Sequence, residues 1–204
     1  VHGISVLTTW DYGALVDQFN TDEKSFFILT NSRAFPSDIA YHLLLEICQN
    51  IQLASAHTNK SFNIILRGDS TLRGHFPTEP DAVEQVLGTF DRWLICPFFE
   101  EGGRVTIDDV HYIREGVRLI PVAESPFAQD ASFGYSNSNL KKWVEEKTNG
   151  RIKEDEVGSL NSLDICNKGA GYVIDMLHQP VKVWIVNAAS MTEVKIFSAA
   201  CRQL

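Results

Sequence analysis

Short apolar runs of four to six residues recur along the chain, separated by longer stretches in which apolar residues have helical spacing. Runs of this length that are rich in β-branched and aromatic residues predict buried strands. We expect strands at residues 4–7, 25–29, 62–66, 93–96 and 181–186. Helices are predicted where apolar residues recur every three or four positions. They are expected at residues 11–19, from 37 to beyond 54, and at 77–90, 140–148, 162–177 and 190 onward.

The order of these elements predicts the fold class. Strands that alternate with helices are typical of an α/β protein with a doubly wound, mostly parallel sheet and flanking helices. Residues 105–122 differ, because apolar and polar positions alternate there around the turn residues Asp108-Asp109 and Glu115-Gly116. This pattern favours a β-hairpin insertion over another helix-bearing unit.

Length and composition narrow the class of protein. The 204 residues suffice for one large domain or two small ones, and the net charge of −8 argues against nucleic acid as a partner. No apolar run is long enough to span a bilayer and no signal-peptide pattern opens the chain, so we expect no membrane partner. The four cysteines lack ligand spacing and lie in apolar stretches, which favours buried, reduced thiols and a cytoplasmic location.

The most concentrated polar chemistry lies at residues 67–74, which follow the predicted strand at 62–66. This segment combines Arg67, Arg73, Asp69, two hydroxyl side chains and two glycines. Arginine presents a rigid fork of donors that matches a carboxylate or phosphate, and glycine lets the backbone approach a ligand. We interpret the segment as an anion- and hydroxyl-binding loop. A surface turn in which the arginines simply pair with Asp69 is the structural alternative.

Arginines follow other predicted strands in the same way. Arg33 comes after the strand at 25–29 and Arg104 after the strand at 93–96. Because the carboxyl ends of parallel strands share one edge of a sheet, Arg33, Asp69, Arg73 and Arg104 are expected to line one crevice there. Their convergence favours an anionic ligand.

Several well-known sites are missing from the sequence. It has neither a phosphate-binding GxxxxGK[ST] loop nor a strand followed by GxGxxG, and it lacks a GxSxG nucleophile elbow. No HExxH motif or Cys/His cluster suggests a metal site. We therefore predict no metal ligand and interpret His75 and His111 as structural polar residues.

Three segments carry a resemblance to a known family. They are RGDSTLRGHF at 67–76, CPFFEEGGRVTIDDVHYI at 96–113 and PVAESPFAQDASFG at 121–134. They closely resemble the N-terminal, acid-sugar-binding domain of four-carbon acid sugar kinases. Their sequence is most similar to that of the plant multidomain members. The resemblance extends nearly end to end, and identifies residues 1–204 as this domain, cut at both ends.

The resemblance implies a function for the full-length protein. Such kinases phosphorylate threonate, erythronate or 3-oxo-tetronate with ATP and Mg²⁺, which a separate C-terminal nucleotide-binding domain of the same chain holds. This domain alone is expected to bind the small-molecule sugar acid, to bind no cofactor and to be inactive.

The resemblance also suggests roles for individual residues. Arg67 and Arg73 would clamp the substrate carboxylate. Substrate hydroxyls would be fixed by Asp69, Ser70 and Thr71, with Gly74 close by. Asp69 is the candidate catalytic residue that accepts the proton of the attacking hydroxyl. Arg33 and Arg104 are further candidate substrate-binding residues, and structural roles for both remain an alternative.

Two departures from the family pattern leave other functions open. The aspartate-rich stretch that usually comes before the equivalent of Val1 is absent, and Asn187 stands where many relatives have Asp. A non-catalytic sugar-acid sensor or scaffold domain within a larger multidomain protein is the first alternative. A purely structural or interaction domain is the second, which the dense polar loop disfavours.

Overall fold

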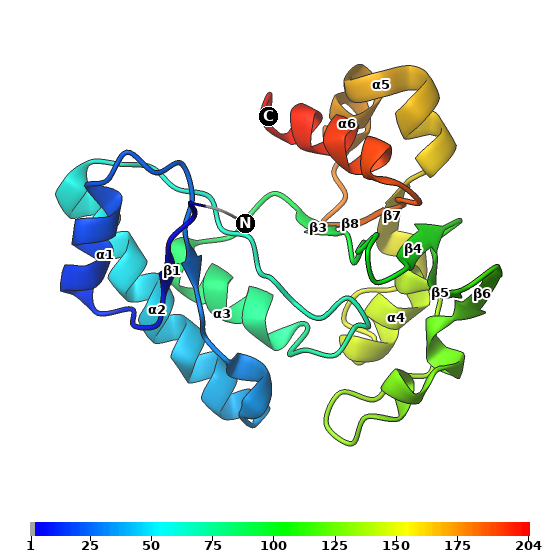
Figure 1. The fold of residues 1–204 in the computed structure, drawn as a ribbon, viewed down its shortest axis with the longest axis horizontal. Coiled ribbons are helices and arrows are strands. Elements are labelled where there is room, and N and C mark those ends of the chain that lie inside the picture. Colours follow the sequence, from blue (N-terminus) through cyan, green and yellow to red (C-terminus); the bar gives the residue numbers. More distant parts are fainter. Residues whose placement is uncertain (1–2) are drawn as a thin grey trace. The chain divides into compact units, whose positions relative to one another are not determined.

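The structure is a computed structural model that describes residues 3–204, so Val1 and His2, the first residues of the predicted domain, lie outside the described residues. The chain forms two compact units (Figure 1). The first contains residues 3–67 and 75–89, and the second contains residues 68–74 and 90–204. No helix in residues 3–204 is long and apolar enough to cross a membrane.

Helices and a parallel strand pair build the first unit. Strands β1 (Val6–Leu7) and β2 (Phe27–Ile28) pair in parallel. The helical elements are α1 (Tyr12–Phe19), η1 (Ser32–Ala34), α2 (Ser37–Thr58) and α3 (Thr78–Leu87).

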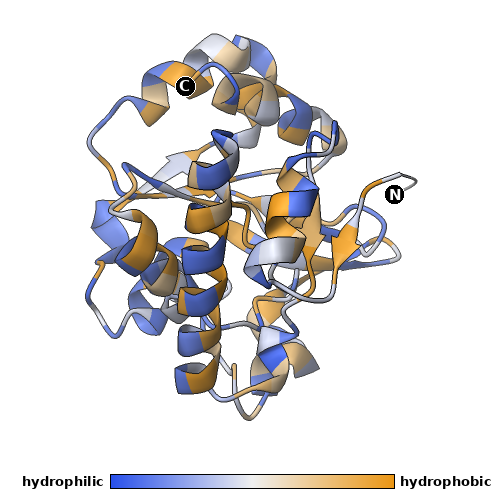
Figure 2. Ribbon diagram, turned by 90° about the vertical axis from the view of Figure 1, so that its left-hand side faces the viewer, coloured by the Kyte–Doolittle hydropathy of each residue, from blue (hydrophilic) through white to orange (hydrophobic). Residues whose placement is uncertain are grey.

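The apolar spacing read from the sequence accounts for the core of this unit. Leu15 and Phe19 of α1 pack with Ile47, Ile51 and Ala54 of α2. In Figure 2, hydrophilic and hydrophobic residues alternate along the long helix α2, as expected for a helix with one buried side.

The strand predicted at 62–66 is wrong. No strand forms at these positions of the described chain, and the side chain of Ile65 is 85% exposed. Apolar composition favours a strand only where a neighbouring strand is present to complete the backbone hydrogen bonds. Here the chain leaves the first unit after Arg67, and the segment has no regular secondary structure.

The second unit is built on a parallel sheet in the order β3-β8-β7. These strands span Trp93–Ile95, Val183–Val186 and Val157–Leu160. Helices α5 (Ser162–Leu177) and α6 (Met191–Cys201) contribute to the core beside β7 and β8. Strand β7 was not predicted, because the sequence Val-Gly-Ser-Leu is too polar to stand out.

The remaining elements of this unit are an antiparallel sheet and short helices. Strands β4 (Arg104–Ile107), β5 (Val110–Glu115) and β6 (Arg118–Pro121) pair in chain order, so the predicted hairpin is extended by a further strand. The first turn is Asp108-Asp109, with φ of 49° and 65°, as a two-residue type I′ turn requires. The other helices are η2 (Val122–Glu124), η3 (Pro126–Gln129), α4 (Leu140–Lys147) and η4 (Glu154–Glu156).

The predicted fold class is confirmed: parallel strands are flanked by helices, and an antiparallel insertion follows β3. The parallel strands form separate sheets, β1-β2 in the first unit and β3-β8-β7 in the second.

The cysteines only partly match the prediction of buried thiols. All four are free, and burial raises the pKa of the Cys48 and Cys96 thiols to about 11. Cys201 packs with Cys96 against the core of the second unit. Cys166 is exposed on α5, so for that residue the prediction is wrong. Helix α5 is kinked at Gly169, where φ is 72° and ψ is −164°, so the helical spacing between Cys166 and the buried Val173 is interrupted.

Gly158 of β7 is required for close packing in the second unit. It lies directly opposite Trp184 in the register of β7 and β8, and a Cβ at this position would be 2.5 Å from the Trp184 ring. Trp184 is 1% exposed and cannot move aside easily. We expect Gly158→Ala to lower the free energy of unfolding by about 1–3 kcal/mol, measured by urea denaturation.

Gly171→Ala is the matched control, because a Cβ there meets nothing within 4 Å. In a helix this change is expected to be neutral or slightly stabilising. Equal stability of Gly158→Ala and the parent would contradict the packing argument.

Candidate functional site

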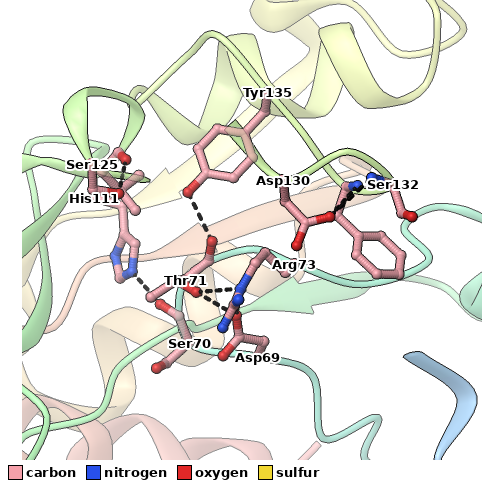
Figure 3. Close-up of polar contacts among 11 residues, drawn as sticks. Asp69, Ser70, Thr71, Arg73, His111, Ser125, Asp130, Ser132 and Tyr135 are labelled. Atoms are coloured by element: carbon pink, nitrogen blue, oxygen red, sulfur yellow. Dashed lines mark hydrogen bonds and ion pairs between the residues drawn. The ribbon is translucent and has the colours of Figure 1, made fainter. Parts of the chain in front are cut away.

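The loop Gly68–Gly74 is part of the second unit and folds around the carboxylate of Asp69 (Figure 3). Arg73 Nε donates to Asp69 Oδ2 at 2.7 Å, and the Thr71 hydroxyl donates to the same oxygen. The amide of Leu72 donates to Asp69 O at 3.0 Å, which closes a tight turn where Leu72 has φ of 65°. The loop is therefore ordered by its own polar groups.

Two buried side chains hold the main chain of this loop. The Tyr135 hydroxyl donates to Thr71 O at 2.8 Å, and His111 Nε2 lies 2.8 Å from Ser70 O (Figure 3). Burial, assisted by the charge of Asp69, raises the pKa of Tyr135 above its ordinary value. Burial lowers the pKa of His111 to about 4, so its imidazole is neutral near neutral pH.

Two guanidinium groups meet at one aromatic ring. Arg73 Cζ lies 4.7 Å and Arg104 Cζ lies 5.7 Å from the centre of the Phe127 ring. Arg73 has Asp69 as its counter-charge, whereas Arg104 forms no ion pair with a carboxylate of residues 3–204. Its Nη1 donates to Gly102 O, and its buried Nε has no hydrogen-bond partner in the described chain.

The electrostatics of this arrangement favour an anion. A partly buried cation without a counter-charge is costly, and an incoming carboxylate would relieve that cost. Guanidinium groups bind carboxylates through short, charge-assisted hydrogen bonds. Arg73 and Arg104, which meet at the Phe127 ring and which we call the arginine pair, therefore form the candidate anion-binding site.

Asn187 follows β8 and clamps the turn of the antiparallel sheet. It is 0% exposed, and its Oδ1 accepts the Asp109 amide at 2.7 Å. Its Nδ2 lies 2.9 Å from Asp109 Oδ1 and 3.0 Å from Ser159 Oγ. Lys141 Nζ is 3.6 Å from the other carboxylate oxygen of Asp109. The Asn187 side chain is thus committed to joining the Asp108-Asp109 turn to the parallel sheet.

Comparison with known families shows which family the chain belongs to. The family model described as "Sugar-binding N-terminal domain" matches residues 1–204. The chain belongs to this family. This match confirms the family membership predicted from the motifs. The structural neighbours of the sugar-binding domain are DUF1537 proteins, the four-carbon acid sugar kinase family. No curated protein matches the chain.

Solved structures confirm the fold of the sugar-binding domain. A Haemophilus influenzae protein of the DUF1537 family shares 18% identity at a TM-score of 0.68, with 89% of this chain and 42% of that chain covered. A Bordetella bronchiseptica DUF1537 domain, a domain-swapped dimer with bound citrate, shares 20% identity at a TM-score of 0.72. That match covers 97% of this chain and 45% of the other. The sugar-binding domain spans less than half the length of either.

The structure brings together some of the predicted site residues. Asp69, Ser70, Thr71, Arg73 and Arg104 all lie in the second unit, and Asp69, Thr71 and Arg73 contact one another. Thr71 is 2% exposed, so its hydroxyl orders the loop. The roles of these residues in substrate binding and catalysis stay predictions.

Two of the remaining predicted residues belong to the first unit, and Gly74 belongs to the loop of the second. Arg67 is exposed and belongs to the first unit, as does Arg33 in η1. Their convergence with the arginine pair stays a prediction. A Cβ on Gly74 would meet nothing within 4 Å, so the backbone there is open to approach.

Two further predictions concern clusters of metal-binding side chains and the structural role of His75. Residues 3–204 contain no group of three or more His, Cys, Asp or Glu side chains suited to a metal ion. His75 is 7% exposed and its Nε2 lies 3.0 Å from Ser32 O within the first unit.

Sequence reasoning missed the partners of the loop. His111 was interpreted only as a structural polar residue and no contact was predicted for Phe127 or Tyr135, yet all three contact the loop or its arginines. The available signal was weak: aromatic residues stand out in the otherwise polar segment 126–139. Their contact with residues more than forty positions away could not be read from local spacing.

Proposed function

We propose that this sugar-binding domain is the acid-sugar-binding part of an ATP-dependent kinase that phosphorylates four-carbon sugar acids such as threonate, erythronate or 3-oxo-tetronate. The observation that carries the proposal is the arginine pair, because Arg104 lacks an anionic partner within residues 3–204 beside an arginine that has one. A carboxylate is the smallest group on a sugar acid that fits this requirement.

The loop next to the arginine pair suits the rest of such a ligand. Asp69 accepts Arg73 and Thr71 on one oxygen and lies in the same loop as Arg73. In the proposal it binds hydroxyl groups of a short polyol chain whose carboxylate is held by Arg104. The citrate bound to the Bordetella bronchiseptica relative supports a ligand rich in carboxylate and hydroxyl groups.

In the proposed reaction this chain positions the acceptor. Phosphoryl transfer depends mainly on alignment and on neutralising charge, so a rigid arginine site contributes by fixing the attacking hydroxyl. Asp69 is the candidate catalytic residue that would take its proton. ATP and Mg²⁺ would be held by a C-terminal nucleotide-binding domain of the same protein, and a cytoplasmic location is part of the proposal.

The test is calorimetric titration of the 204-residue chain with threonate and erythronate against their uncharged polyols. The acids are expected to bind at least about tenfold more tightly, because a charge-assisted hydrogen bond contributes roughly 1.5–3 kcal/mol. ATP hydrolysis by this chain alone is not expected. Equal binding of polyols and acids would contradict the carboxylate site and leave the loop with a structural role.

A further inference from the structure

Two buried donors grip consecutive carbonyl groups of the loop. His111 Nε2 is 2.8 Å from Ser70 O, and the Tyr135 hydroxyl is 2.8 Å from Thr71 O (Figure 3). His111 is 0% exposed and Tyr135 is 5% exposed. Donors that are fully withdrawn from water are costly unless they are bonded, so these contacts hold the loop main chain firmly.

The hydrogen-bond chemistry fixes the state of His111. A backbone carbonyl only accepts, so the proton must be on Nε2. Nδ1 is then an acceptor, and it receives the hydroxyl of Thr106, whose Oγ1 is 2.9 Å away. Thr106 and His111 are paired residues of β4 and β5, so the sheet register itself sets the ring orientation.

Strand β4, which carries Thr106, also carries one member of the arginine pair. Arg104 precedes Thr106 by two positions on β4, and residues at that spacing point to the same face of a strand. The loop carries Arg73, and it is tied to β4 and β5 through Ser70, His111 and Thr106. This chain of contacts sets where Arg73 stands relative to Arg104.

We propose that His111 and Tyr135 are positioning residues, which pin the loop so that Arg73 meets Arg104 at Phe127 ready for an anionic ligand. The inference rests on the proposed function for its ligand, but not for its structural content. His111 acts on the main chain through Ser70 and touches no reacting atom. The site is thereby preformed, and the ligand does not have to order the loop when it binds.

Two His111 variants separate positioning from folding. His111→Gln keeps a side-chain N–H donor, whereas His111→Leu has similar volume and none. Amide hydrogen exchange at Leu72, whose N–H donates within the turn to Asp69 O, reports the order of the loop without any ligand. We expect exchange about tenfold faster in His111→Leu, because an unbonded buried carbonyl is costly, with rescue by His111→Gln.

Tyr135→Phe gives an independent variant that removes a single oxygen. It is also expected to speed Leu72 exchange, by about three- to tenfold. Exchange at amides of α6, far from the loop in sequence, is the internal control and should be unchanged. Equal Leu72 exchange in the parent, His111→Leu and Tyr135→Phe would overturn the proposal, as would failure of His111→Gln to rescue.

Titration with threonate completes the experiment. His111→Leu and Tyr135→Phe are expected to bind about three- to tenfold more weakly, and His111→Gln about as tightly as the parent. If the parent itself binds no sugar acid, the proposed function fails while the exchange data still decide the positioning role. If exchange changes but affinity in the folded variants does not, positioning for the ligand is refuted.

Discussion

Arg104→Ala is expected to weaken binding of threonate or erythronate about ten- to a hundredfold, since a charge-assisted hydrogen bond contributes roughly 1.5–3 kcal/mol. Arg104 has no carboxylate partner among residues 3–204, so its removal takes away attraction for the ligand without exposing a buried acid. Its stability cost should be small for the same reason. Calorimetric titration of the folded variant measures the effect.

Arg73→Ala is expected to weaken binding of these sugar acids as much as Arg104→Ala does, for two reasons. It removes a guanidinium from the arginine pair, and it removes the ion pair that Arg73 forms with Asp69, whose side chain is 17% exposed. Arg73→Lys should bind better than Arg73→Ala yet remain weaker than the parent, because a point charge cannot reproduce a two-donor fork.

Arg118→Ala on β6 is the matched control, since Arg118 is exposed and lies in the same antiparallel sheet. It should bind like the parent. If Arg104→Ala and Arg73→Ala also bind like the parent, the arginine pair has no role in recognising the acid. A uniform loss in all three variants would instead indicate a general charge effect.

Asn187→Asp is expected to lower the free energy of unfolding by about 2–4 kcal/mol near neutral pH. The change replaces an N–H donor with a carboxylate oxygen 2.9 Å from Asp109 Oδ1, in a fully buried position. Two carboxylates at this separation cannot both be charged cheaply, so one pKa must rise. The surroundings of this side chain are built for an amide, which both donates to and accepts from Asp109.

The pH dependence gives this prediction a distinct signature. A carboxyl whose pKa is raised by folding binds its proton more tightly in the folded state. The free energy of unfolding of the protein therefore falls as pH rises through that pKa. The deficit of Asn187→Asp should therefore shrink in mildly acidic buffer. Urea denaturation at several pH values measures it, and the double variant Asp109→Asn with Asn187→Asp should recover stability. A variant as stable as the parent near neutral pH would refute the clamp.

Local pattern was enough to predict most helices and the fold class. The apolar spacing of α2 and the capping box at Ser190 are local features, and the structure contains both elements. The strand expected at 62–66 and the unpredicted β7 show the limit. Whether an apolar segment forms a strand depends on a neighbouring strand, and β7 forms because β8 lies beside it.

The candidate site could be predicted only in part. The loop at 67–74 was recognised because its polar residues are adjacent in sequence, and Asp69 does organise it. Arg104 was only one of several candidates, since nothing local shows that it lacks a counter-charge. Phe127, His111 and Tyr135 depend on contacts across more than forty residues, which one sequence does not reveal.

The interleaving of the two units in sequence decides how the protein can be divided for experiments. Residues 68–74 lie with the second unit, while the chain on either side of them lies with the first. A fragment ending at residue 89 would keep Asp69 and Arg73 but lose Arg104, His111 and Tyr135. A fragment starting at residue 90 would lose the loop itself. Neither fragment contains all the residues of the candidate site. Deletion mapping therefore cannot assign ligand binding to one part of the chain.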